Sequence, residues 1–148
     1  MTIANREVKI YPVTKAGSPL VVFNAFENEG AAVRSELDKL TTADFSLATI
    51  NITNWNADLS AWAIPPVYKN DDLFTGGADA YLEALAGEII PAIIGELGYE
   101  PAYIALAGYS LAGLFCYVRY VSHGQVRKDR QRVGLNVVSG LRGVRKVS

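Results

Sequence analysis

Residues 103–115 constrain the fold of this chain more strongly than any other stretch of its sequence. A short apolar run over 104–107 leads into the pattern Gly-x-Ser-x-Ala-Gly at 108–113, and helical spacing follows. A strand that becomes a helix within so few residues needs small neighbours and one residue that accepts an unusual φ. This arrangement lifts a serine Oγ above a parallel sheet as a nucleophile, so the sequence predicts that Ser110 lies on a nucleophile elbow. The alternative is a tight connection that carries an incidental serine.

The chain before this stretch alternates strands and helices. Residues 20–26 and 45–52 are apolar runs rich in β-branched and aromatic side chains, a pattern typical of strands covered on both faces. Residues 31–40, between them, carry apolar side chains at helical spacing. A β-α-β order of this kind builds parallel strands joined by a right-handed crossover. We therefore predict an α/β protein, a three-layer α/β/α sandwich whose mainly parallel sheet has about five strands.

Three further segments have weaker patterns. Residues 7–11 alternate polar and apolar side chains, which predicts an edge strand followed by a hairpin-like connection. Residues 53–77 are predicted to be a long irregular segment. A helical apolar stripe runs from Asp79, the predicted N-cap, to Gly98, the predicted stop, and Pro91 predicts a kink within it.

The composition limits the available chemistry. The chain has 148 residues, which suits one domain. Cys116 and His123 are the only residues of their types, so we expect no disulfide, no metal site and no cofactor, and we expect Cys116 to be a small core residue. The sequence shows neither an apolar run of membrane-spanning length nor a secretory leader. We therefore expect a cytoplasmic protein that does not contact membranes.

The charge changes sharply along the chain. Residues 1–116 contain 6 Lys or Arg and 14 Asp or Glu, whereas residues 117–148 contain 8 Lys or Arg and 1 Asp. Such a shift marks a boundary, a tail with its own partner, or foreign sequence. We accordingly divide the chain into a folded N-terminal part, residues 1–121, and a basic tail, residues 122–148.

The basic tail has three interpretations. Clustered Lys and Arg suit a nucleic-acid or membrane-binding arm, but no interleaved aromatic residues or known module support it, so we expect no nucleic-acid partner. A surface helix followed by a sixth strand at 133–138 is the second interpretation. The third, which we favour, is a truncated chain, including one whose reading frame shifts after about residue 116.

The predicted elbow also suggests where the other groups of an active site would lie. A helix that begins beside Ser110 directs free amides toward an anion, so the N–H of Leu111 is a candidate oxyanion donor. A second donor should come from the loop after the 20–26 strand, and the N–H of Phe26 is our candidate. In the irregular segment, Trp55 and Trp62 either line a substrate pocket or pack the segment onto the sheet.

Five segments together resemble a known family; they are residues 23–30, 54–62, 74–79, 88–91 and 108–113. They are similar to α/β-hydrolase-fold esterases of the group that includes S-formylglutathione hydrolases and siderophore (enterobactin-type) esterases. The resemblance runs from about residue 3 to about residue 117. It implies that Ser110 forms an acyl-enzyme with a small-molecule ester, and that Leu111 and the Phe26 region form the oxyanion hole.

The sequence departs from this family after the elbow. In the family, an acid and a histidine follow the serine in chain order, each after a further strand. Here His123 follows Ser110 by thirteen residues on the same predicted helix, which places the two roughly 15–20 Å apart, too far for a general base. We therefore interpret residues 1–121 as the N-terminal part of an incomplete α/β-hydrolase fold.

Two hypotheses for function follow. The first is a serine esterase, a carboxylic-ester hydrolase impaired by the missing acid and histidine. The second is a catalytically inactive hydrolase-fold remnant that self-associates or binds a ligand. Both predict a homo-oligomer, because truncation would expose a sheet edge beside the serine strand, and an exposed edge pairs with other chains.

Overall fold

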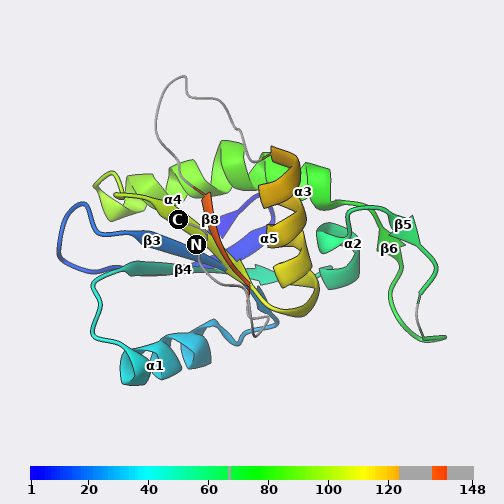
Figure 1. The fold of residues 1–148 in the computed structure, drawn as a ribbon, viewed down its shortest axis with the longest axis horizontal. Helices are drawn as coiled ribbons and strands as arrows, with labels where there is room; N and C mark the ends of the chain where they lie inside the picture. Colours follow the sequence, from blue (N-terminus) through cyan, green and yellow to red (C-terminus); the bar gives the residue numbers. More distant parts are fainter. Residues whose placement is uncertain (67, 124–134, 140–148) are drawn as a thin grey trace.

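A six-stranded sheet forms the centre of the computed structural model, which describes residues 1–66, 68–123 and 135–139. In spatial order its strands are β1 (Thr2–Ile3), β2 (Arg6–Tyr11), β4 (Ser46–Ile52), β3 (Leu20–Phe26), β7 (Ile104–Gly108) and β8 (Leu135–Ser139). β4, β3, β7 and β8 run parallel, while β1 and β2 pair antiparallel (Figure 1). The prediction of an α/β fold with a mainly parallel sheet is confirmed.

Helices cover both faces of this sheet. α1 (Gly30–Leu40) lies on one face, and α3 (Ala78–Ala84), α4 (Ile90–Leu97) and α5 (Ser110–His123) lie on the other (Figure 1). α1 begins close to β4, and this approach requires glycine at residue 30 because a Cβ there would collide with the Thr49 side chain. The opposite face buries apolar side chains from helices and strands, which include Leu20, Val22, Ile50, Leu85, Ile89, Ile93, Leu106 and Phe115. The sheet therefore has the three-layer packing expected of a chain with alternating strands and helices.

The N-terminal strand differs from its prediction in two respects. β2 is not the edge of the sheet, because the two-residue strand β1 pairs along its outer side. The hairpin that joins β1 to β2 places Ala4 and Asn5 at positive φ. Glycine usually takes this conformation, and because neither position is a glycine, the sequence did not indicate the turn. β2 also pairs with β4 rather than with β3, so the connection that follows it is not a hairpin.

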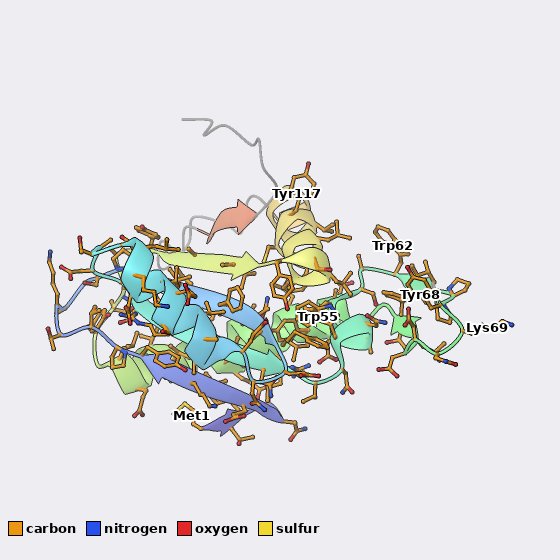
Figure 2. The ribbon with its side chains drawn as sticks, turned by 90° about the horizontal axis from the view of Figure 1, so that it is seen from below. Met1, Trp55, Trp62, Tyr68, Lys69 and Tyr117 are labelled. Atoms are coloured by element: carbon orange, nitrogen blue, oxygen red, sulfur yellow. The ribbon has the colours of Figure 1, made fainter. Side chains whose placement is uncertain are left out.

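The segment predicted to be irregular, residues 53–77, contains regular structure. It forms α2 (Trp55–Leu59) and a separate two-stranded sheet of β5 (Ala63–Ile64) and β6 (Phe74–Thr75). The prediction of an irregular segment was therefore wrong in part. Each of these elements is too short for sequence periodicity to reveal it. Figure 2 shows the β5–β6 sheet projecting from the body of the molecule.

The helix that follows starts earlier than predicted. Its N-cap is Gly77 and not Asp79, which lies in the first turn. The physical reason is packing, because the Gly77 N–H donates to the carbonyl of Ala57 over 2.9 Å, and a Cβ on Gly77 would lie 2.6 Å from that oxygen. The stop at Gly98 is confirmed by its left-handed φ of 71°.

The helix is interrupted near Pro91, as predicted, but by a π-helical stretch and not by a simple kink. A π-helical stretch, η1 (Leu85–Ile89), separates α3 from α4 (Ile90–Leu97) and ends just before the proline. Proline lacks the N–H that an α-helix needs at this point, and a wider turn relieves the missing hydrogen bond. The interruption predicted at Pro91 is therefore a local π-helical turn.

Residues 135–139, which form β8, are the part of the chain after α5 that the structure describes. β8 pairs with β7 in parallel register, with Ile104 opposite Leu135 and Gly108 opposite Ser139, and it overlaps the predicted strand at 133–138. The predictions for 124–134 and 140–148, the nucleic-acid arm included, lie outside the described residues. Among the residues that the structure does describe, no helix is long and apolar enough to span a bilayer.

Candidate active site

Ser110 lies at the junction of β7 and α5, as the sequence predicts. β7 ends at Gly108, Tyr109 follows it, and Ser110 begins α5 with an exposed side chain and a φ of 49°. A positive φ in a residue with a Cβ costs about 1–3 kcal/mol and persists only where the surrounding structure enforces it. The strained serine therefore depends on the packing of the strand against the helix.

Small residues make that packing possible. A Cβ on Gly108 would lie 2.7 Å from the Cβ of Ala112 and 2.9 Å from its carbonyl carbon. A Cβ on Gly113 would lie 3.2 Å from the carbonyl oxygen of Gly108. A side chain at residue 108 therefore has no room where α5 crosses the end of β7, and one at residue 113 would be tightly packed, which explains these glycines in steric terms.

The amide of Leu111 lies in the first turn of α5. Amides of a first helical turn have no acceptor within the helix, and the helix dipole makes this end attractive to negative charge. The geometry therefore suits the predicted role of Leu111 as an oxyanion donor.

The amide of Phe26, the second candidate donor, already has an acceptor. The Phe26 N–H donates to Oε1 of Glu29 over 2.8 Å. The other carboxylate oxygen of Glu29, Oε2, accepts a hydrogen bond of 3.2 Å from the hydroxyl of Tyr109. One carboxylate thus joins the loop after β3 to the residue that precedes Ser110. Sequence reasoning missed Glu29, because no spacing relates residues 29 and 109.

Aromatic side chains surround this carboxylate bridge. The ring of Trp55 lies 5.3 Å from that of Phe26 and 5.7 Å from that of Tyr109, and the ring of Phe23 lies 6.3 Å from that of Tyr109. These centroid distances fall within the range of favourable aromatic pairs. We call Phe23, Phe26, Trp55 and Tyr109 the aromatic cluster. Trp62 does not belong to it, since its 60% exposed side chain lies by the projecting β5–β6 sheet (Figure 2).

A hollow of about 660 Å³ adjoins the aromatic cluster. It lies beyond the carboxyl ends of β3 and β4, where open α/β sheets bind their ligands. Its lining is mainly polar and consists of Phe26, Glu27, Asn28, Asn51, Ile52, Thr53, Trp55, Asn56, Asn70, Asp71 and Asp72. The Phe26 and Trp55 side chains link this hollow to the elbow.

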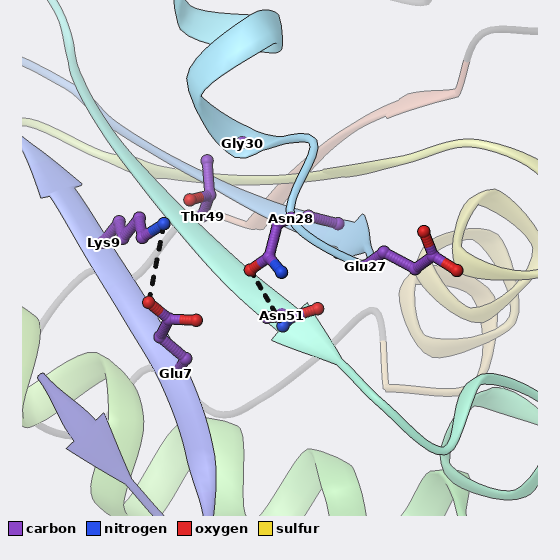
Figure 3. A pocket seen from close by; sticks show the side chains of 8 residues that line it. Glu7, Lys9, Glu27, Asn28, Gly30, Thr49 and Asn51 are labelled. Atoms are coloured by element: carbon purple, nitrogen blue, oxygen red, sulfur yellow. Dashed lines mark hydrogen bonds and ion pairs between the residues drawn. The ribbon is translucent and has the colours of Figure 1, made fainter.

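A second, much smaller cavity lies between β2, β4 and the start of α1 (Figure 3). Its volume of about 10 Å³ is no more than one water molecule needs. Lys9 and Glu7 form an ion pair of 3.5 Å on one side of it, and Asn51 donates to Asn28 over 3.4 Å on the other (Figure 3). This cavity is too small for an organic substrate.

Neither His123 nor Cys116 has the properties that catalysis at Ser110 would need. His123 is the last residue of α5, so it lies about 20 Å from Ser110 along the helix axis. Burial raises the pKa of the Cys116 thiol to about 12, which keeps it protonated at neutral pH. Within the described residues, no group of three His, Cys, Asp or Glu is placed to hold a metal ion.

The Glu29 carboxylate contributes to a raised pKa of Tyr109. Partial burial, the hydrogen bond to Glu29 and the negative charge of that residue raise the pKa of Tyr109 to about 12. A carboxylate that accepts from a phenol favours the neutral phenol, so a Glu29→Gln substitution should lower the pKa of Tyr109 toward its ordinary value of about 10. An ultraviolet titration, with Tyr109→Phe to identify the signal, measures this shift. An unchanged titration would contradict the hydrogen bond.

These features define a fold. A mainly parallel sheet, helices on both faces and a serine at positive φ between strand and helix are the features of an α/β hydrolase fold. No family model matches the sequence, and no curated protein matches it.

Solved structures give the particular likeness. An IroE-like serine hydrolase from Shewanella oneidensis matches with a TM-score of 0.65 and 18% identity, over 79% of this chain and 42% of that one. The siderophore hydrolase EstB from Aspergillus nidulans matches with a TM-score of 0.56 and 16% identity, over 84% of this chain and 51% of that one. The siderophore hydrolase EstA from the same organism matches with a TM-score of 0.59 and 18% identity, over 80% of this chain and 50% of that one. The chain shares their fold and spans about half of their length, which confirms the predicted resemblance at the level of fold.

Proposed function

We propose that this chain is a serine esterase-like protein in which Ser110 attacks the carbonyl of a small-molecule ester. The observation that carries the proposal is the φ of 49° at Ser110, a strained backbone held at the junction of β7 and α5. In the attack, the serine Oγ loses its proton and bonds to the acyl carbon, the ester C–O bond breaks, and the leaving alkoxide takes up that proton and departs as the alcohol. The likeness of the fold to serine hydrolases supports this chemistry.

The amides near Ser110 would stabilise the charge that develops in this reaction. The carbonyl oxygen gains negative charge as the tetrahedral intermediate forms, and fixed N–H donors lower the energy of that state. Leu111 offers such a donor from the first turn of α5, and Phe26 at the end of β3 would offer a second once its N–H no longer donates to Glu29. We propose that the aromatic cluster and the adjoining hollow receive the acyl and alcohol parts of the ester.

The distance between His123 and Ser110 shapes the kinetics that we expect. His123, the one histidine among residues 1–148, is the last residue of α5, about 20 Å from Ser110 along the helix axis, so its position does not suit a base for that serine. A serine without its base retains only residual reactivity, which suffices for activated esters far better than for ordinary ones. We therefore propose that acylation by an activated ester is faster than release of the acyl group.

A second candidate function rests on the distance between His123 and Ser110. The distant histidine equally suits a hydrolase fold that binds a ligand or a second copy of itself without catalysis. In either case we propose a cytoplasmic homo-oligomer that pairs through the outer edge of β8, the last described strand of the sheet. Light scattering tests the assembly, and a monomer at all concentrations would rule it out.

Acylation by p-nitrophenyl acetate tests the first function. We expect a burst of p-nitrophenolate that approaches one equivalent per chain, followed by slow turnover, because an acyl-enzyme accumulates. Mass spectrometry of the intact chain and of its peptides should place one acetyl group on the peptide that contains Ser110. Acetyl groups found only on lysine or tyrosine side chains would favour the non-catalytic alternative.

A further inference from the structure

The carboxylate of Glu29 accepts a hydrogen bond from the amide that we propose as the second oxyanion donor. The Phe26 N–H points at Oε1 of Glu29 over 2.8 Å, a length typical of a charge-assisted hydrogen bond. An amide N–H has one hydrogen to donate, so it cannot bind a substrate oxygen while Glu29 holds it. While this hydrogen bond is formed, the Phe26 amide is not free to act as the proposed second oxyanion donor.

Tyr109 holds the carboxylate in this position. Its hydroxyl donates 3.2 Å to Oε2 of Glu29, and Tyr109 immediately precedes Ser110. None of the ion pairs in the described part of the chain includes Glu29. The carboxylate is thus held by neutral donors and is half-buried, so it can exchange these contacts for water.

The loop that carries Glu29 has a strained backbone of its own. Glu27 has a φ of 49°, the same unusual value as Ser110. This turn brings the chain back after Phe26, so that the Glu29 side chain reaches an amide three residues earlier. Strain of this kind is costly in a residue with a Cβ, and it collects at sites that bind ligands or change conformation.

We propose that Glu29 is a built-in blocking residue, whose carboxylate fills the oxyanion site at the Phe26 amide until a substrate oxygen displaces it. The inference rests on the proposed function in that the displaced carboxylate would make room for the ester carbonyl. It also predicts a property independent of catalysis: once Glu29 is removed, the site binds a small carboxylate from solution. The chemistry it recognises is an oxyanion held by backbone amides.

Nuclear magnetic resonance of the full chain tests the blocking role directly, with sodium acetate as the probe. All variants carry Ser110→Ala, so that a failure of the serine chemistry does not affect the result. In Glu29→Ala we expect the Phe26 amide proton to move upfield, and acetate to shift the Phe26 and Leu111 amides with about tenfold tighter binding than in the parent chain. Glu36→Gln removes a similar charge from an exposed position on α1 and should leave both amides unchanged.

Two further variants keep the test decisive if Glu29→Ala does not fold. Glu29→Gln removes only the charge, and Tyr109→Phe removes only the second donor, so each should weaken the block and strengthen acetate binding by a smaller factor. With Ser110 restored, Glu29→Gln should also raise the rate of acetylation by p-nitrophenyl acetate severalfold. Folded variants whose Phe26 amide neither shifts nor binds acetate more tightly would overturn the proposal, whatever the outcome for Ser110.

Discussion

Gly108→Ala should lower the free energy of unfolding by about 3 kcal/mol, because it forces a methyl group into a space that the fold has already filled. The new Cβ would lie 2.7 Å from the Cβ of Ala112 and 2.9 Å from its carbonyl carbon. One of these atoms belongs to the backbone, so a side-chain rotation cannot relieve the contact. α5 must instead move away from β7, which should also release the strained φ of Ser110.

Gly95→Ala is the matched control for this substitution. Gly95 lies in α4, and a Cβ there would meet nothing within 4 Å. Alanine has the higher helix propensity, so this variant should be more stable than the parent chain by about 0.5–1 kcal/mol. Urea unfolding followed by circular dichroism measures both variants. Equal stability of the two variants would show that the elbow is not packed as closely as described.

Asp58→Ala should have the second-largest effect, a loss of about 2–4 kcal/mol, because it leaves a largely buried guanidinium without its anion. Arg6 on β2 and Asp58 on α2 form an ion pair of 2.7 Å, with side chains only 16% and 21% exposed. The Arg6 guanidinium also lies 4.7 Å from the ring centre of Tyr81. The pair ties α2, which carries Trp55, to the sheet, so the variant should also alter tryptophan fluorescence.

An exposed ion pair of equal length provides the control. Glu36 and Lys39 on α1 are also 2.7 Å apart, but both side chains are 64% exposed. Glu36→Ala should therefore change stability by less than about 0.5 kcal/mol. Replacing Arg6 with Met in the Asp58→Ala background removes the unpaired charge and should restore part of the loss. If Asp58→Ala and Glu36→Ala had equal effects on urea unfolding, burial would not determine the strength of the Arg6–Asp58 pair.

The sequence predicted the centre of the fold because its signals are long or sterically specific. β3 and β4 are seven-residue apolar strands, and the elbow requires glycine and alanine at fixed positions. β1, α2, β5 and β6 were not predicted, since elements of two to five residues are too short to show a period. The helix start at Gly77 depends on contact with Ala57, which no local pattern reveals.

The parts of the candidate site that are local in sequence were predictable, and the parts that depend on distant residues were not. The elbow is local in sequence, so the positions of Ser110 and Leu111 at the end of a strand follow from the neighbouring residues alone. The bridge from Glu29 to Tyr109 joins residues 80 positions apart, and only the pairing of β3 with β7 brings them together. The separation of Trp55 from Trp62 likewise depends on how α2 and the β5–β6 sheet fold.

We propose that Ser110 is a nucleophile held in a strained elbow, and covalent labelling with a fluorophosphonate probe measures its reactivity. We expect the wild-type chain to take up about one phosphonate per chain under prolonged labelling, the adduct to map to Ser110, and Ser110→Ala to abolish it. A folded wild-type chain that remains unlabelled, or one whose labelling persists unchanged in Ser110→Ala, would contradict the claim.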